Sequence, residues 1–184
     1  LPALKKIRMA DEAFAKVIYE RKSAAFRELD RYIRLVAPTD MTVLILGNTG
    51  TGKEHLAGKI HKRSLRANKP YITVDCGSLS RELAASAFFG HVKGAFTGAT
   101  DEKPGYFQEA RGGTLFLDEV ENLPVEIQQM LLRAMEERRY RPVGGRQDKR
   151  MDVRVIAATN EDLQDAVAEK RFRKDLLYLS LIHI

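Results

Sequence analysis

The residues best suited to chemistry form a glycine-rich loop that closes on a lysine. The apolar run Val43 to Leu46 leads into this loop, and a helix-compatible segment from Glu54 to Ile60 follows it. Glycines let backbone N–H groups turn inward around phosphate oxygens, and a lysine at a helix start adds positive charge there. A chance glycine-rich turn is the plainer alternative, but the flanking strand and helix disfavour it. We therefore predict a phosphate-binding loop made of Gly47, Asn48, Thr49, Gly50, Thr51, Gly52 and Lys53.

Two adjacent carboxylates follow a second apolar run. The segment from Gly112 to Leu117 is expected to be a strand, and Asp118 and Glu119 come directly after it. In an ATPase with a phosphate-binding loop, the first carboxylate holds Mg²⁺ and the second accepts a proton from the attacking water. An Asp-Glu pair alone is also a common way to enter a helix. Its place downstream of a phosphate-binding loop favours ATP hydrolysis.

An amide follows a third apolar run. Val153 to Ala158 are expected to form a strand, and Asn160 lies just beyond it, where its side chain can orient the attacking water. One position departs from the generic phosphate-loop pattern. Glu54 stands where Ser or Thr usually supplies a hydroxyl to Mg²⁺.

The stretch from Gly90 to Thr100 has glycines every four residues, which deny it regular structure. Phe96 and Thr97 lie at its centre between small residues. Because loops run over the surface, Phe96 is either tucked back into the core or held out as a contact. Its spacing alone leaves both possibilities open.

The remaining elements position these groups on a sheet. Strands alternate with helices, and each motif follows a strand, which predicts a parallel α/β sheet sandwiched by helices with its ligand at the carboxyl edge. Residues 1–17 are expected to be a linker, and residues 18–184 one domain. Strands are predicted at Thr42–Leu46, Tyr71–Asp75, Gly112–Leu117, Val153–Ala158 and from Leu179; helices at Ser23–Val36 (capped by Ser23), Lys53 to about Arg66, Ser80–Phe89, from Pro124, Asp162–Glu169 and Phe172–Leu177; and a basic hairpin or loop at Arg139–Arg150. The helix from Pro124 is expected to carry one apolar face made of Ile127, Met130, Leu131, Ala134 and Met135.

Composition excludes several classes. The 184 residues carry a net charge of +6 and a single cysteine, Cys76, so no intramolecular disulfide is possible. The four histidines share no metal-ligand spacing. The apolar runs are too short to span a bilayer and no signal peptide is expected, so we expect a cytoplasmic protein without a membrane partner. Basic clusters at residues 59–66 and 138–150 admit nucleic-acid contact but are more often solvated surface.

From about Ile18 to Ile184, the chain resembles the AAA+ ATPase domain of bacterial enhancer-binding proteins, which activate transcription with sigma-54. The most specific match is the GAFTGA loop that defines this family, formed here by Gly94, Ala95, Phe96, Thr97, Gly98 and Ala99. The family carries Glu after the loop lysine, as Glu54 does here. Further matches are Gly112–Glu119 (Walker B), Arg141–Gly145 (second pore loop), Ala157–Asn160 (sensor I) and Phe172–Leu176 (arginine fingers).

This resemblance implies an AAA+ P-loop NTPase whose helical lid is expected to be absent from this chain. It also implies a homo-oligomeric ring, usually a hexamer, with ATP and Mg²⁺ bound between subunits. Asp118 would hold Mg²⁺, Glu119 would polarise water, and Arg173 would reach into the neighbouring site. The GAFTGA loop would bind sigma-54 and remodel the closed polymerase–promoter complex, while a domain outside this chain would bind DNA.

Three departures from the family pattern keep alternatives open. Asp75 stands where the family often has an Asn that can hold the catalytic glutamate inactive, and Asn48 stands where Glu is usual. The chain has Tyr178-Leu179 where the family has Tyr-Arg-Leu, so the second finger arginine is missing. One alternative is therefore a nucleotide-binding regulator with impaired hydrolysis. A second is an ATPase acting directly on nucleic acid through Arg139 and Arg141.

Overall fold

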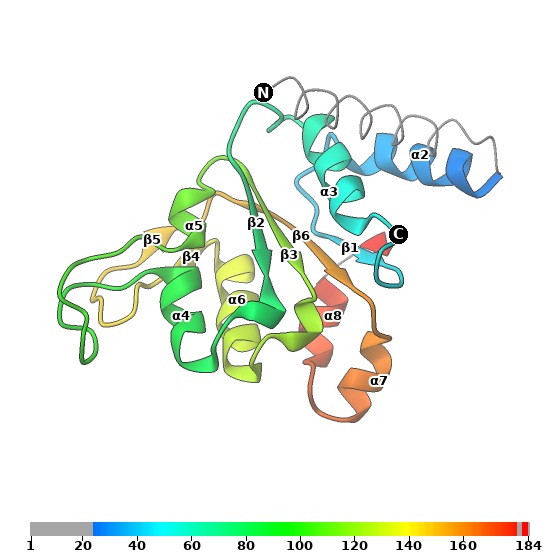
Figure 1. Cartoon of the computed structure of the whole chain (residues 1–184). Helices are drawn as coiled ribbons and strands as arrows, with labels where there is room; N and C mark the ends of the chain where they lie inside the picture. Colours follow the sequence, from blue (N-terminus) through cyan, green and yellow to red (C-terminus); the bar gives the residue numbers. More distant parts are fainter. Residues whose placement is uncertain (1–23, 180–181, 184) are drawn as a thin grey trace, which may run out of the picture.

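The computed structural model describes residues 24–179 and 182–183 (Figure 1). The expected linker at residues 1–17 and the expected helix cap at Ser23 lie outside these residues. None of the described helices combines the length and the apolar character needed to cross a membrane.

Five parallel strands form the central sheet in the order β2-β3-β6-β1-β7. The predicted parallel α/β class is confirmed. Each strand before β7 lies within two residues of its predicted bounds, since runs of branched and apolar side chains suit a sheet that is buried on both faces. The bounds are Val43–Leu46 (β1), Tyr71–Asp75 (β2), Thr114–Asp118 (β3), Arg154–Thr159 (β6) and Ile182–His183 (β7).

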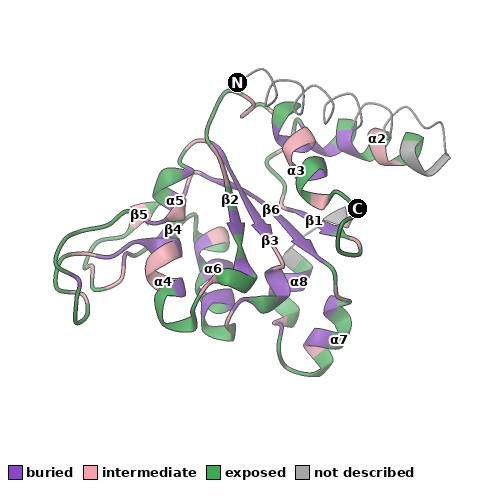
Figure 2. Cartoon of the chain, viewed as in Figure 1, coloured by how far each residue is buried: buried purple, intermediate pink, exposed green. Residues whose placement is uncertain are grey.

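Helices cover both faces of this sheet, and alternation along each strand decides which face a side chain joins. Val43 and Ile45 pack under α2 and α3, whereas Leu44 between them faces the other helices. Figure 2 shows the central strands β3 and β6 almost wholly buried, the edge strand β2 only partly so, and the helices exposed on their outer sides. The helices are α2 (Ala24–Val36) and α3 (Lys53–Lys62) on one face, and α4 (Arg81–Phe89), α5 (Tyr106–Glu109), α6 (Val125–Glu137), α7 (Leu163–Ala168) and α8 (Lys174–Leu179) on the side of the larger core.

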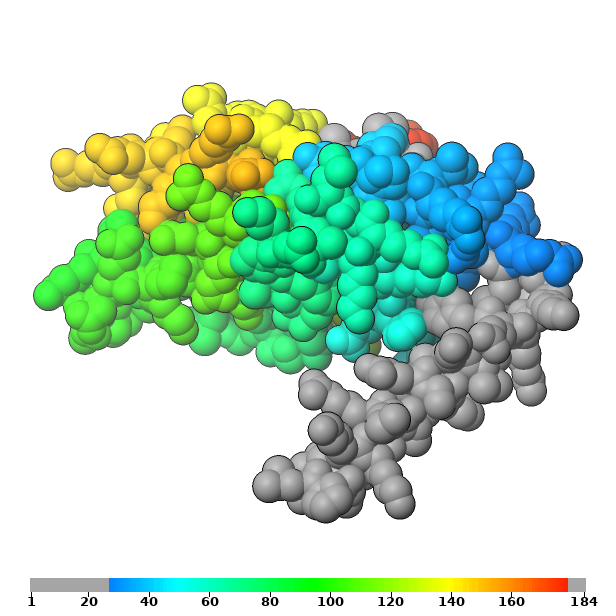
Figure 3. All heavy atoms as spheres, turned by 90° about the horizontal axis from the view of Figure 1, so that it is seen from above, coloured from blue at the N-terminus to red at the C-terminus, as the bar shows by residue number. Residues whose placement is uncertain are grey.

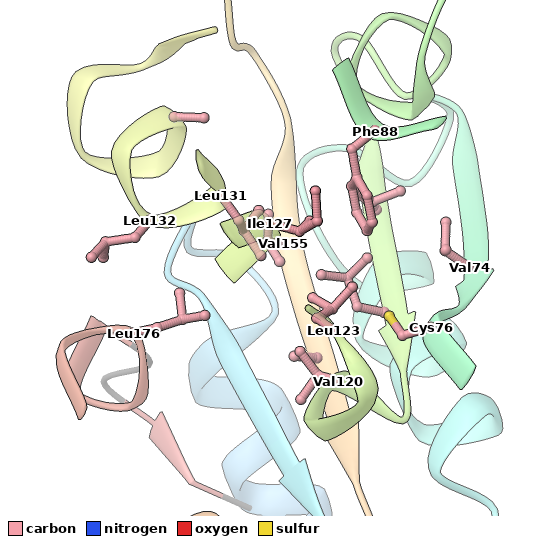
Figure 4. Close-up of a cluster of buried hydrophobic side chains, with 14 of the residues drawn as sticks. Val74, Cys76, Phe88, Val120, Leu123, Ile127, Leu131, Leu132, Val155 and Leu176 are labelled. Atoms are coloured by element: carbon pink, nitrogen blue, oxygen red, sulfur yellow. The ribbon is translucent and has the colours of Figure 1, made fainter. Parts of the chain in front are cut away.

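Helix α6 packs its apolar stripe into the larger core (Figure 4). Ile127 and Leu131 are buried there as predicted. Met130, which the periodicity placed on the same face, is instead 37% exposed and lines a surface hollow of about 240 Å³ with Phe89 and Arg133. The buried position goes to a polar residue, Gln128, which is 0% exposed.

Helix α3, Leu179 and three short elements differ from the predictions, whereas the hairpin is one of two predicted alternatives. Leu179 ends α8 instead of beginning the last strand, which is Ile182–His183 in the structure. Helix α3 ends at Lys62 rather than near Arg66, because the Ser64 hydroxyl donates to His61 O and accepts from Arg66 N, which forms a turn. Arg139–Arg150 forms a hairpin, with β4 (Arg139–Tyr140) antiparallel to β5 (Lys149–Arg150). Helix α5 and two 3-10 turns, Cys76–Ser78 and Val120–Asn122, were not expected, since three or four residues show no periodicity.

A buried arginine joins α2 to the sheet. The Arg154 side chain is 1% exposed and donates to the carbonyls of Val36 and Ala37 at 2.8 Å and of Met41 at 3.3 Å. These carbonyls belong to the C-terminal end of α2 and the segment after it, which lacks donors of its own and carries partial negative charge. Burial lowers the pKa of this guanidinium. Arg154 therefore acts as a cap supplied from β6.

A half-buried carboxylate on α2 ties this helix to α3. Asp30 forms ion pairs with Lys59 (2.9 Å), Arg34 (2.8 Å) and Arg63 (2.8 Å). Hydrogen bonds from Lys59, then Arg34, and from Arg63 hold the pKa of the Asp30 carboxyl well below its usual range. The helix is thus fixed by Arg154 at its end and by Asp30 along its length.

Candidate active site

The glycine loop joins β1 directly to α3. Gly50 and Gly52 have φ values of 80° and 86°, in the left-handed region that favours glycine. Gly47 has a different reason to lack a side chain, because an added Cβ would lie 2.9 Å from the Thr51 hydroxyl. The first residue of α3 is Lys53, so the loop leads straight to a helix N-terminus. This strand–loop–helix order agrees with the predicted phosphate site.

The lysine side chain lies over its own loop. Lys53 Nζ donates to Gly47 O at 2.8 Å and to Asn48 O at 3.1 Å. The Thr51 hydroxyl also donates to Asn48 O, at 2.7 Å. Two neutral carbonyls thus satisfy the ammonium. Phosphate oxygens are stronger partners because they are charged.

Asp118 ends β3, and Glu119 begins the turn beyond it. Asp118 Oδ1 accepts from the Glu119 N–H at 3.0 Å, and Glu119 has a left-handed backbone with φ of 52°. The Glu119 carboxylate accepts from Asn122 Nδ2 at 3.1 Å. Asp75 pairs with Asp118 in the strand register, but its side chain accepts from Gly77 N and caps the turn after β2. The contact to Glu119 therefore comes from Asn122.

Asn160 follows β6 and reaches the glycine loop. Its Nδ2 donates to the Thr49 hydroxyl at 3.1 Å. Gly47 N also donates to Thr159 O at 3.2 Å, so two contacts join the end of β6 to the loop. Because β6 lies between β1 and β3, the loop, the carboxylates and this amide all lie at the carboxyl edge of adjacent strands. That edge is where open α/β sheets bind their ligands.

Residues at this edge fit ATP and Mg²⁺ by their chemistry. Among the described residues, no group of three or more His, Cys, Asp or Glu side chains could hold a metal ion. Mg²⁺ in nucleotide sites does not need such a cage, since it binds one or two carboxylates, substrate phosphates and water. Half-buried Asp118 offers that carboxylate. The nearby thiol is not a candidate nucleophile, because burial raises the pKa of Cys76.

Arg173 lies just before α8 and pairs within its own chain. Its guanidinium donates to both oxygens of Asp175, at 3.0 and 2.6 Å, which raises the pKa of Arg173. Arg171 is similarly paired with Glu161 and Glu169. Within the described part of the chain, no hydrogen bond or ion pair joins Arg173 to the glycine loop, Asp118 or Glu119. The structure therefore does not bring this predicted residue to the site of its own subunit.

The GAFTGA loop projects from one end of the molecule (Figure 1, green, far left). Gly94 and Gly98 have positive φ, and Gly94 N donates to Ala99 O at 2.8 Å, which closes the loop. Phe96 is 41% exposed, and its ring lies 5.0 Å from that of buried His91. The sequence left open whether this ring is buried or exposed, and in the structure one side is covered while the other faces solvent. Thr97 is exposed.

A second loop lies against the first. Val92 N donates to Val143 O at 3.1 Å, and Val143 N donates to Gly90 O at 2.9 Å. A Cβ at Gly144 would come within 2.8 Å of Ala95 Cβ. Figure 3 shows the two segments together at one end, green beside yellow to orange. The segment 141–145 is therefore part of the same projecting tip.

Sequence reasoning missed Asn122 beside Glu119, Gln128 in α6 and His91 in the projecting tip. Asn122 is polar and three residues beyond Glu119, a spacing that could have indicated a contact. Gln128 interrupts the apolar stripe of α6 and is buried, which for a polar residue requires partners. No sequence signal pairs His91 with Phe96.

The chain matches the family described as the Sigma-54 interaction domain over residues 19–184. It is 47% identical to the transcriptional regulatory protein GlrR of Escherichia coli K12 over 168 residues, 91% of this chain and 38% of that protein. It is 47% identical to the sigma54-dependent transcriptional regulator SfnR of Pseudomonas fluorescens over 97% of this chain and 48% of that protein. The chain thus spans less than half the length of these relatives.

Solved structures agree with these matches. The crystal structure of NtrX from Brucella abortus in complex with ATP has a TM-score of 0.81 and 33% identity, covering 99% of this chain and 40% of that one. The P-loop NTPase domain of a sigma-54 activator from E. coli has a TM-score of 0.62 over 89% of this chain and 94% of that one. At 21% identity, this second match shows the fold alone.

Proposed function

The chain belongs to the family of sigma-54 interaction domains, and from this premise we propose that it is the ATP-hydrolysing core of a sigma-54-dependent transcription activator. Its relatives are named as regulators of this kind, and its fold is that of the AAA+ P-loop NTPases. The observation that carries the proposal is the meeting of Lys53, the pair Asp118-Glu119 and Asn160 at one sheet edge, with Asn160 bonded to Thr49.

Each residue at this edge has one proposed role in hydrolysis. The loop Gly47–Lys53 and the start of α3 bind the phosphates of ATP, with Glu54 in the first turn. Mg²⁺, held by Asp118, neutralises phosphate charge when bound. Water attacks the γ-phosphorus, the bond to the β-phosphate oxygen breaks, and Glu119 accepts the water proton. Asn160 orients that water and registers the γ-phosphate through its link to the loop.

A positive charge that stabilises the transition state comes from a second subunit. We assign Arg173 to the site of a neighbour in a homo-oligomeric ring, a hexamer by family resemblance. A guanidinium supplied in trans is worth ~10³–10⁵ in rate in other phosphoryl-transfer enzymes. For that role Arg173 must leave Asp175, its partner in the isolated chain.

The GAFTGA loop is the part of the ring that contacts sigma-54. Exposed Phe96 and Thr97 offer an apolar and a hydroxyl contact to sigma-54, and glycines at Gly94 and Gly98 supply hinges. Movement of this loop remodels the closed complex of RNA polymerase, sigma-54 and promoter. Promoter DNA is bound by a further domain, and these partners place the activity in the bacterial cytoplasm.

A specific observation favours a second candidate, a nucleotide-binding regulator with impaired hydrolysis. Arg171 is held by Glu161 and Glu169, so it does not replace the arginine missing at Tyr178-Leu179. Direct action on nucleic acid is disfavoured by pairing of the basic hairpin, since Arg139 bonds Glu137 and Arg141 bonds Asp148.

The proposed function is tested by trapping with ADP and aluminium fluoride, a mimic of the hydrolytic transition state. We expect the full-length protein to form a complex with sigma-54, and Thr97→Ala and Lys53→Ala to form none. A complex that survives Thr97→Ala, or none for the unaltered protein, contradicts the activator role. If Glu119→Ala leaves promoter activation unchanged, the nucleotide-binding regulator is the better description.

A further inference from the structure

One buried side chain connects the two halves of the proposed catalytic machinery. Gln128 is the fourth residue of α6 and is 0% exposed. Its Nε2 donates to Leu123 O at 2.8 Å and to Arg171 O at 2.9 Å. Its Oε1 accepts from Arg173 N at 2.8 Å. Both N–H groups of the amide are therefore used, and each partner is a main-chain group.

The partners belong to segments with different roles. Leu123 ends the short turn that begins at Glu119, so it lies on the segment that carries the proposed general base. Arg171 and Arg173 flank buried Phe172 in the segment that leads into α8. The amide thus spans from the chain's own hydrolytic site to the residue that acts in the neighbouring one.

Main-chain contacts hold the residues on either side of Arg173. The main-chain N–H groups of Arg171 and Phe172 both donate to Ala166 O, at 2.9 and 3.0 Å, which anchors them to α7. The N–H of Arg173 donates to Gln128 instead. Its carbonyl accepts from Leu177 N of α8 at 3.2 Å, and its guanidinium pairs with Asp175 in the first turn of that helix. Gln128 is therefore the side chain that joins the main chain of Arg173 directly to α6.

We infer that Gln128 is a positioning residue for the arginine that each subunit lends to its neighbour. This inference rests on the proposed function. A displacement of the turn Val120–Leu123, as Glu119 changes partners during hydrolysis, is passed through one rigid amide to the base of Arg173. Gln128 therefore acts in trans on catalysis and links the nucleotide state of one site to the arginine offered to the next.

The variant Gln128→Met tests this inference, because methionine keeps the unbranched shape and removes all three hydrogen bonds. We expect ATP affinity within about threefold of the unaltered protein and kcat lowered by about 10–100-fold, since a small misplacement of a catalytic group costs on the order of a hundredfold. Gln129→Met, at the neighbouring exposed position, is the matched control and leaves both unchanged.

Mixed rings separate an effect in trans from a local one. Lys53→Ala subunits have a disabled site but an intact Arg173. Excess Lys53→Ala subunits are expected to restore hydrolysis per Gln128→Met subunit toward that of the unaltered protein, since each now receives a well-placed arginine. The reference is Arg173→Ala mixed in the same way. All rates are measured on full-length proteins at a concentration where the ring forms.

The outcomes distinguish the inference from the function it rests on. Rescue of both mixtures supports the trans role of Gln128. Rescue of Arg173→Ala without rescue of Gln128→Met overturns the inference and leaves the proposed function intact. If neither mixture is rescued, Arg173 does not act in trans, and the inference about Gln128 fails with it. If Gln128→Met loses ATP affinity, Gln128→Leu, which removes the same three hydrogen bonds, takes its place under the same criteria.

Discussion

The side-chain amide of Asn122 donates a hydrogen bond of 3.1 Å to the carboxylate of Glu119. The same carboxylate lies against Gly77, where an added Cβ would approach it to 2.6 Å. Asp75, the position at which the family often carries an amide, bonds to the main chain of Gly77 instead. In this chain the amide that contacts Glu119 thus comes from the turn after β3 rather than from β2.

Removing this amide is expected to raise basal ATP hydrolysis. In Asn122→Ala the Glu119 carboxylate loses a hydrogen bond worth about 1 kcal/mol, and turning it toward the attacking water becomes easier by roughly fivefold. Steady-state phosphate release measures this change, with Gln129→Ala as control. A rate at or below that of the unaltered protein would show that Asn122 does not restrain Glu119.

A side chain at Gly144 is expected to separate hydrolysis from sigma-54 binding. Gly144 has φ of 72°, and a Cβ would lie 2.8 Å from Ala95 Cβ, so Gly144→Ala must shift the GAFTGA loop. The displaced loop no longer presents Phe96 and Thr97 in the same arrangement, so trapping of sigma-54 is expected to be roughly tenfold weaker. The ATPase rate should stay near that of the unaltered protein. Arg146→Ala, on the same loop, should change neither quantity, and full trapping by Gly144→Ala would contradict the contact.

The variant Arg154→Met is expected to lower the free energy of unfolding by about 2–4 kcal/mol. The carbonyls that Arg154 serves at the end of α2 would lose their donors, and the end of that helix would lose a cation. Urea unfolding measures the loss as a lower midpoint with an unchanged slope. The control is Arg150→Met, at an exposed position on β5. Equal midpoints for the two variants would refute the capping role.

Protonation of Asp30 is expected to weaken the link between α2 and α3. Its folded-state pKa lies below the unfolded value, so its contribution is fully present above the unfolded pKa, about 4, and is lost as pH falls through the folded one. Asp30→Asn should therefore cost about 1 kcal/mol at pH 7. Unfolding curves at several pH values should show this difference shrinking below pH 4; a difference independent of pH would contradict the ion-pair origin.

Local patterns predicted the fold and the placement of the site where several residues repeat one signal. The runs before Gly47, Asp118 and Asn160 all became strands of one sheet, because consecutive apolar residues suit only a buried position. Because these strands are parallel, the three motifs that follow them lie at the same edge of the sheet. The roles assigned to the individual residues remain predictions.

Pairings set by tertiary structure were not predictable. Arg154 lies in an apolar run, and only the packing of α2 shows that its guanidinium caps a helix. Met130 was expected on the buried face and is partly exposed. Gln128 is buried because main-chain groups of a distant segment need hydrogen bonds at that position. Helical periodicity counts apolar side chains and contains no information about such partners.

The tip that carries Phe96 is fastened to two helices rather than one. One connection runs from α4 through Gly90 into the tip. The other runs from Val143, which is hydrogen-bonded to Gly90 and Val92, back through β4 to α6. His91 and Lys103 also bond to each other across the base of the loop. A force on Phe96 would therefore be shared between α4 and α6. The displacement of the tip would then depend on how far these two helices tilt together, in addition to any movement at Gly94 and Gly98.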